Sequence, residues 1–298
     1  DGIDLVVFEE FGSGAAAIHL ADEVERNDLL QDEAYRRRFR KDYEAKFSPR
    51  VWHRDFHDAH IVACPDQELV GMSVGEVAEL RNIHPCDAFL DLVVAHGRHF
   101  RWKTVIANHR PEVLRSMIVQ PSVQIGFADS GAHLRNMGFY NFPLHLLRMA
   151  RDAERAGDTS FLSIEEAVNR LTGEPAEWFD LDAGRLAPGH RADIAIIDPQ
   201  ALDADLDGYH EAPTPGMGLN RIVRRNDRAV TATIIGGQLA FSQGRFARDF
   251  GEQRYGRFLR AGLQQRNPVP REAPTDTGRY SALQTSPPTQ APLRATLG

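Results

Sequence analysis

The chain has 298 residues, of which 42% are hydrophobic and 26% are charged, and its formal net charge is −7. This length and composition are ordinary for a globular protein with a sizeable core. No apolar run approaches the roughly 18 residues of a membrane-crossing helix, so we expect no membrane association. The negative charge argues against general attraction to nucleic-acid phosphates. The only cysteines, Cys64 and Cys86, form no C-x-x-C pair, which argues against a disulfide framework and favours a reducing cytoplasm.

The first hundred residues read mostly as helix, after one apolar stretch. Residues 3–8 predict a buried strand, as in a chain that begins inside a fold, and residues 22–46 carry a charged helical pattern. Ser73 and Glu76 have the spacing of a capping box, in which each side chain accepts from a backbone N–H of the first turn. A helix should therefore begin there. Pro85, followed by apolar residues three and four positions apart, predicts a second amphipathic helix.

The next stretch predicts a β-α-β unit. Residues 104–107 and 123–128 are short apolar runs typical of strands, and residues 111–117 between them read as a helix. Two strands joined through a helix are usually parallel neighbours, and α/β folds place their chemistry at the C-terminal ends of such strands. His109 follows the first strand and Asp129 follows the second. We therefore expect both side chains at the same edge of the sheet.

Three further helical segments are expected beyond this unit. Residues 142–156 have a helical pattern, and Ser163 and Glu166 repeat the capping-box spacing at the start of a second helix. Residues 175–179 add a short helical turn.

The last part of the chain changes from helix to strand. Residues 191–197 and 231–235 are rich in β-branched residues and predict strands, and residues 236–237 are two glycines that fit a hairpin turn. After about residue 266 the chain is rich in Pro, Thr, Ser and Gln. Its apolar residues are too sparse to offset the ordering entropy, so we expect a largely disordered tail.

Three stretches in fixed order resemble the amidohydrolase superfamily. Residues 126–133, Gly-Phe-Ala-Asp-Ser-Gly-Ala-His, resemble the end of the family's eighth barrel strand, which carries a single essential Asp. Residues 162–176 are similar to the helix pair after the barrel, and residues 184–198 to the return into a small β-sandwich. The sequence around Asp129 and Phe142 is most similar to the D-aminoacylase branch, the N-acyl-D-amino-acid deacylases. The resemblance covers roughly the whole chain except its tail.

The resemblance implies an α/β fold and an enzyme. It implies the C-terminal half of a TIM-type (β/α)8 barrel over residues 1–183, a small β-sandwich over residues 184–248 and an extension over residues 249–298. The implied activity is zinc-dependent hydrolysis of a C–N amide bond in a small N-acyl amino acid, in the cytoplasm. The alternative enzyme is a cyclic-amide hydrolase of the hydantoinase or dihydroorotase kind. The non-enzymatic alternative is a metal-free interaction domain.

The resemblance also assigns a candidate site. Asp129 would bind the metal and move the proton, because a carboxylate beside a cation stays ionised within hydrogen-bond reach of the bound water. A loop Asp that caps a helix is the alternative. His109 would contact substrate or stabilise its loop, and His133 would line the pocket or cap the following segment. Arg135 would bind a substrate carboxylate through its bidentate guanidinium, or lie on the surface.

The chain departs from the family pattern in its histidines. The family takes its other metal ligands from earlier strands, beginning with a His-x-His pair, and no His-x-His occurs among the 12 histidines here. The resemblance therefore implies that the other zinc ligands precede residue 1, on a missing N-terminal half or a partner such as a second copy, and that this chain is inactive alone. The strand edges of a half-barrel would favour such pairing. His53, His57 and His60 share no convincing helix pattern and are interpreted as surface or packing residues instead of a metal cluster.

Overall fold

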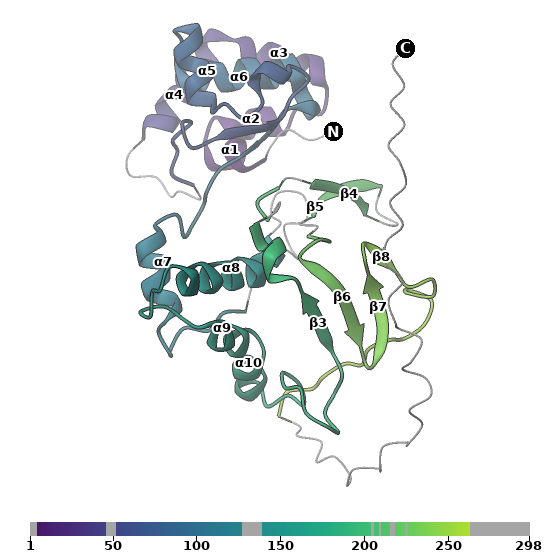
Figure 1. Cartoon of the computed structure of the whole chain (residues 1–298). Helices are drawn as coiled ribbons and strands as arrows, with labels where there is room; N and C mark the ends of the chain where they lie inside the picture. Colours follow the sequence, from purple (N-terminus) through teal and green to yellow (C-terminus); the bar gives the residue numbers. More distant parts are fainter. Residues whose placement is uncertain are drawn as a thin grey trace, which may run out of the picture. The chain divides into compact units, whose positions relative to one another are not determined.

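The computed structural model describes residues 5–45, 52–126, 139–203, 206–208, 210–214, 218–223 and 226–262 (Figure 1). These form two compact units. The first comprises the described residues up to 167 together with those between 199 and 229, and the second comprises those of 168–198 and from 230 onward. Helices dominate the first unit and an antiparallel sheet dominates the second, so the chain is of mixed helix and sheet. None of the described helices is both long and apolar enough to span a bilayer.

The first unit begins with a helical body that carries one small antiparallel strand pair. Two short strands, β1 (His60–Ala63) and β2 (Arg101–Lys103), pair antiparallel beside it. Short 3-10 turns, η1 (Gln67–Leu69) and η2 (Gly97–His99), connect the elements. The helices of this body are α1 (Leu5–Glu10), α2 (Gly14–Ile18), α3 (Glu23–Gln31), α4 (Glu33–Glu44), α5 (Val74–Arg81) and α6 (Pro85–His96).

The helix starts in this body follow local capping rules. Asp22 accepts backbone N–H groups at the start of α3, and Asp32 does the same for α4. The predicted capping box is confirmed: Ser73 N donates to Glu76 Oε2 at 2.6 Å, and Glu76 N donates to Ser73 Oγ at 3.0 Å. Pro85 occupies the first turn of α6, as predicted.

The strand expected over residues 3–8 is wrong, because from Leu5 onward this stretch forms α1. Phe8 is fully buried there, with its ring centroid 5.7 Å from that of Phe39 and 5.9 Å from that of Phe89. A short apolar run is equally compatible with a buried strand and a buried helix. Packing against α4 and α6 decides between them.

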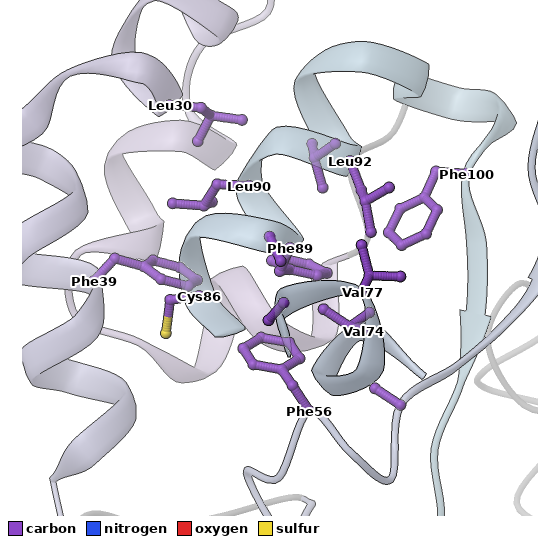
Figure 2. Close-up of a cluster of buried hydrophobic side chains, with 14 of the residues drawn as sticks. Leu30, Phe39, Phe56, Val74, Val77, Cys86, Phe89, Leu90, Leu92 and Phe100 are labelled. Carbon is purple, nitrogen blue, oxygen red and sulfur yellow. The ribbon is translucent and has the colours of Figure 1, made fainter. Parts of the chain in front are cut away.

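An aromatic core holds the helical body together. Phe89 of α6 is fully buried and lies between Phe56, at a centroid distance of 5.0 Å, and Phe39, at 6.5 Å (Figure 2). Trp102 of β2 meets the Phe89 ring edge-on at 5.8 Å. Phe100 adds a further contact at 6.2 Å. Side chains from helices, a loop and strand β2 thus converge on Phe89.

Ion pairs join α4 to α6 at the edge of this core. Arg40 Nη2 lies 2.6 Å from Asp87 Oδ2, and the Asp87 side chain is only 10% exposed. Arg36 Nη2 lies 2.6 Å from Asp91 Oδ1. A buried carboxylate such as that of Asp87 needs such partners, because burial without them disfavours its charged form.

The β-α-β unit expected over residues 104–128 does not form over the described residues. Residues 104–107 and 123–126 contain no strand, whereas the helix between them is present as α7 (Pro111–Ile118). Strand pairs in the described part of the chain are antiparallel. A strand needs a neighbouring strand, and neither run belongs to a sheet in the described part of the chain. The partial barrel therefore stays a prediction.

The first unit also contains α8 and the described residues between 199 and 229, which we call the excursion. The predicted helix is confirmed as α8 (Phe142–Arg155), preceded by the turn η3 (Phe139–Asn141). The buried Arg151 donates to Pro199 O at 2.7 Å and pairs with Asp203, which fixes the turn η4 to α8. The elements of the excursion are η4 (Pro199–Asp203), β4 (His210–Thr214) and β5 (Leu219–Val223), the two strands forming an antiparallel pair.

The second unit is built on a four-stranded antiparallel sheet. Its strand order is β3-β6-β7-β8 (Figure 1). The two-glycine turn is confirmed: Gly236 and Gly237 have φ of +58° and +82° between β6 and β7, values that glycine adopts without strain. The elements are α10 (Gly173–Trp178), β3 (Ile194–Ile197), β6 (Val230–Ile235), β7 (Gln238–Ser242) and β8 (Arg245–Phe246).

Helix α9 (Ile164–Leu171) leads from the first unit into the second. Its predicted capping box is confirmed, since Ser163 N donates to Glu166 Oε2 at 2.8 Å and Glu166 N donates to Ser163 Oγ at 3.2 Å. The small sandwich and the domain boundaries at residues 183 and 248 stay predictions. The expected tail after residue 266 lies outside the described residues.

Candidate functional site

Three of the four candidate site residues fall outside the described part of the chain. Asp129, His133 and Arg135 all lie between residues 126 and 139, which are the nearest described positions on either side. Their proposed roles stay predictions. What the structure shows is how the two ends of this segment are held.

The C-terminal end of the Asp129 segment is fixed by two consecutive side chains. Tyr140 Oη donates to Ile222 O at 2.8 Å. Asn141 is buried, and its Nδ2 donates to Leu206 O at 2.8 Å and to Asn226 Oδ1 at 3.1 Å. An unpaired buried amide is costly, so these bonds specify one position for the start of α8. The excursion thus anchors the chain directly after the segment.

The N-terminal flank is anchored through α7. The Arg115 guanidinium pairs with Asp158 Oδ2 at 2.5 Å and lies over the Phe161 ring, 4.2 Å from its centroid. Hydrogen bonds from Ser160, together with the nearby Arg115 charge, lower the pKa of Asp158 below its usual value, so this carboxylate stays ionised. The described residues on both sides of the Asp129 segment therefore have defined hydrogen-bond or ion-pair partners.

His109 is the one candidate site residue that the structure describes. Its side chain is exposed, and its ring meets that of His53 edge-on at a centroid distance of 4.1 Å. His53 Nδ1 in turn lies 3.4 Å from Asp58 Oδ2. The sequence places His53 and His109 in separate patterns, and only the fold brings them together. The proposed contact between His109 and substrate remains a prediction.

His57 bridges two carboxylates at the start of α5. Its Nε2 lies 3.0 Å from Glu79 Oε1, and its Nδ1 lies 3.0 Å from Asp55 Oδ1. Both ring nitrogens can donate only when the ring is the imidazolium ion. The hydrogen bonds to Glu79 and Asp55 accordingly raise the pKa of His57 above its usual value. The ring also packs against α5 so closely that a Cβ at Gly75 would come within 2.4 Å of it.

This geometry predicts a pH-dependent contribution to stability. The pKa of His57 is higher in the folded than in the unfolded protein, so its protonated ring stabilises the fold. This contribution is fully present below about pH 6.5, the pKa of an unfolded histidine, and is lost as the pH rises through the folded-state pKa. We expect His57→Gln to lower the free energy of unfolding at pH 5.5 by about 0.2–1 kcal/mol, the range of exposed ion pairs, and to have a smaller effect at pH 9. Urea denaturation at the two pH values measures the difference.

The matched control is His99→Gln, because His99 is exposed and the described residues offer it no carboxylate partner. That variant should follow the pH dependence of the parent protein. If His57→Gln also follows the parent at both pH values, the bridging imidazolium contributes nothing.

The histidines of residues 53–60 do not form a metal site. Within the described ranges no group of three His, Cys, Asp or Glu side chains could hold a metal ion. His57 and His60 are exposed and His53 is half-buried. This placement agrees with their interpretation as surface or packing residues.

Comparisons with known proteins give a family match over about a third of the chain. Residues 140–241 match the model of the amidohydrolase family. This range contains two of the three sequence stretches that carry the predicted resemblance, residues 162–176 and 184–198. The first stretch, with Asp129, lies just before it.

The relatives at sequence level are longer than this chain. An uncharacterized protein of Mycobacterium tuberculosis (strain ATCC 25618 / H37Rv) is 56% identical over 270 residues, which cover 88% of this chain and 44% of that protein. The chain thus spans less than half the length of this relative. A dihydroorotase of Geobacillus sp. (strain WCH70) is 34% identical over 91 residues, or 30% of this chain and 20% of that enzyme.

Among solved structures, an N-acyl-D-glutamate deacylase of Bordetella bronchiseptica matches with a TM-score of 0.41 and 20% identity, over 70% of this chain and 38% of that one. The superfamily predicted from the three stretches is therefore confirmed at sequence level by the family model. Over residues 140–241, the sequence of this chain is similar to the amidohydrolase family.

Proposed function

We propose that this chain is part of a metal-dependent amidohydrolase that cleaves the C–N bond of N-acyl-D-amino acids, with Asp129 as its proton-transfer residue. The observation that carries the proposal is the family match over residues 140–241, which begins directly after the Asp129 stretch. The D-amino-acid substrate rests on the similarity of the sequence around Asp129 and Phe142 to the D-aminoacylase branch.

The proposed chemistry needs a base that also serves as an acid. An amide is hydrolysed when water attacks its carbonyl carbon and the leaving nitrogen receives a proton. A carboxylate at position 129 would take the proton from the attacking water and return it to that nitrogen. His109, His133 and Arg135 are proposed to contact the substrate, with Arg135 binding its carboxylate through paired N–H donors.

The proposed zinc ion needs ligands beyond the described residues. The described part of the chain has no three-residue group that fits a metal, and Asp129 would supply one carboxylate. Zinc, when bound, would lower the pKa of its bound water toward about 7. We propose that the remaining ligands come from polypeptide outside residues 1–298, in the same protein or in a partner copy, and that residues 1–298 alone are inactive.

A cyclic-amide hydrolase is the second candidate. The observation that favours it is the 34% identity to a dihydroorotase over 91 residues. Both candidate activities cleave a C–N bond and use the same Asp. They differ in whether the amide of the substrate is open or part of a ring.

A substrate panel on the full-length protein separates them. We expect hydrolysis of N-acetyl-D-amino acids, with the N-acetyl-L series, hydantoin and dihydroorotate turned over at least 100-fold more slowly. Turnover of the ring amides in preference to the acyl amino acids would favour the second candidate. Hydrolysis of neither class by a zinc-loaded protein would leave the non-catalytic interaction domain.

A further inference from the structure

The second unit contains a small cavity with charged walls. Its volume is about 330 Å³, and its lining includes the side chains of Asp182, His190, Arg191 and Arg257 beside the turn at Gly236. This volume lies at the lower end of the range of small-molecule pockets, so a ligand must be small.

Arg191 is held in the cavity wall by Asp193. The Arg191 side chain is only 9% exposed, and its Nε donates to Asp193 Oδ2. The same carboxylate accepts from Gly236 N at 2.7 Å. Burial alone would raise the pKa of Asp193, but the bonds from Gly236 and Arg191 outweigh it and lower this pKa, so the pair stays ionised. Within the described ranges Arg191 binds only Asp193, which leaves the donors on its two Nη atoms for a ligand.

The second pair of charges in the lining is loosely held. Arg257 Nη2 lies 3.4 Å from Asp182 Oδ2, and the Arg257 side chain is 53% exposed. The Asp182 side chain is 19% exposed, so the exposed partner of this long pair is Arg257, whose guanidinium is the group free to turn toward a ligand. Arg257 can therefore turn to an anionic group, while the Asp182 carboxylate stays in the wall and can accept from a cationic one.

The balance of charges selects the ligand class. Two guanidinium groups of the lining, Arg191 and Arg257, are offset by the Asp182 carboxylate in the lining and by Asp193 behind Arg191. A dianion such as phosphate would be repelled by both carboxylates, and a simple cation by both guanidinium groups. A small molecule with one charge of each sign meets an opposite charge at both ends.

We propose that this cavity binds a free amino acid, with its carboxylate against Arg257 and Arg191 and its ammonium group facing Asp182. Planar guanidinium groups suit a carboxylate because they donate two parallel hydrogen bonds. The proposal uses only residues of the second unit and holds whether or not the protein is a hydrolase.

Isothermal titration of the full chain tests the ligand class. Alanine should bind saturably with a millimolar dissociation constant, at least tenfold more tightly than acetate, methylammonium or phosphate. D- and L-alanine are both titrated, so that the result does not depend on stereochemistry. Absence of saturable alanine binding, or equal affinity for acetate or phosphate, would overturn the proposal.

Two variants locate the site. Arg257→Gln should weaken alanine binding at least tenfold, and because Arg257 is half exposed the fold should survive, as thermal unfolding would verify. Asp182→Asn should weaken alanine binding without weakening acetate binding. The control is Arg185→Gln, since Arg185 is 62% exposed, pairs with Glu177 and does not line the cavity. If Arg257→Gln and Arg185→Gln bind alanine with equal affinity, the assignment of the amino-acid site to this cavity is contradicted.

Discussion

Replacing Asp129 by Asn is expected to lower the kcat of the full-length protein on its best N-acyl-D-amino acid by about 10²- to 10⁴-fold, the usual contribution of a general acid–base residue. Asparagine keeps the size of the side chain and can still accept a hydrogen bond. It cannot take a proton from water. The attack of water on the carbonyl carbon and the protonation of the leaving nitrogen are therefore both slowed. Steady-state kinetics measures the loss.

The matched control for this variant is Asp28→Asn. Asp28 is an exposed residue of α3, and its replacement should leave kcat unchanged. Thermal unfolding of both variants should match that of the parent, because Asn caps a helix about as well as Asp, so a loss of kcat reports on the chemistry and not on folding. Equal kcat in Asp129→Asn and the parent would remove Asp129 from the chemistry.

Replacing Phe89 by Ala is expected to lower the free energy of unfolding of the helical body by about 3–5 kcal/mol. The ring is fully buried between Phe39 and Phe56, and its removal leaves a cavity that five surrounding aromatic contacts cannot fill. This loss is a large part of the ~5–15 kcal/mol by which domains are stable. Urea denaturation followed by tryptophan fluorescence reports on it, since Trp52 and Trp102 lie in the same core.

The control for the core is Phe258→Ala. Its side chain is 85% exposed, so the change should stay within about 0.5 kcal/mol of the parent. A Phe89→Ala protein as stable as Phe258→Ala would mean that the aromatic cluster does not hold the helical body together.

The helices were predictable because their signals are local. The capping boxes at Ser73 and Ser163 and the first-turn Pro85 each act within four residues of the helix start, so the sequence alone contains the whole interaction. The turn between β6 and β7 is equally local, since its two glycines supply the positive φ values themselves.

The strands were less predictable because a strand depends on a partner elsewhere. Residues 3–8 and 104–107 have the composition of strands, yet the first packs as a helix and the second finds no neighbour among the described residues. β2 forms just before the expected position, where β1 offers an antiparallel edge. Apolar composition alone therefore does not decide whether a run pairs as a strand.

The candidate site was predictable only in part, for the same reason. Asp129 was identified by its motif and by the strand expected before it. The anchoring of the following chain by Asn141, and the contact between His53 and His109, join residues far apart in sequence. The charge-balanced cavity likewise combines Asp182, Arg191 and Arg257, which no spacing pattern connects.

The most direct test of the hydrolase proposal is metal removal from the full-length protein. As isolated, it should contain zinc and hydrolyse an N-acyl-D-amino acid. Chelation should abolish turnover, and added zinc should restore it. A full-length protein that binds no metal and hydrolyses no amide would contradict the proposed function, while the family match over residues 140–241 would still stand.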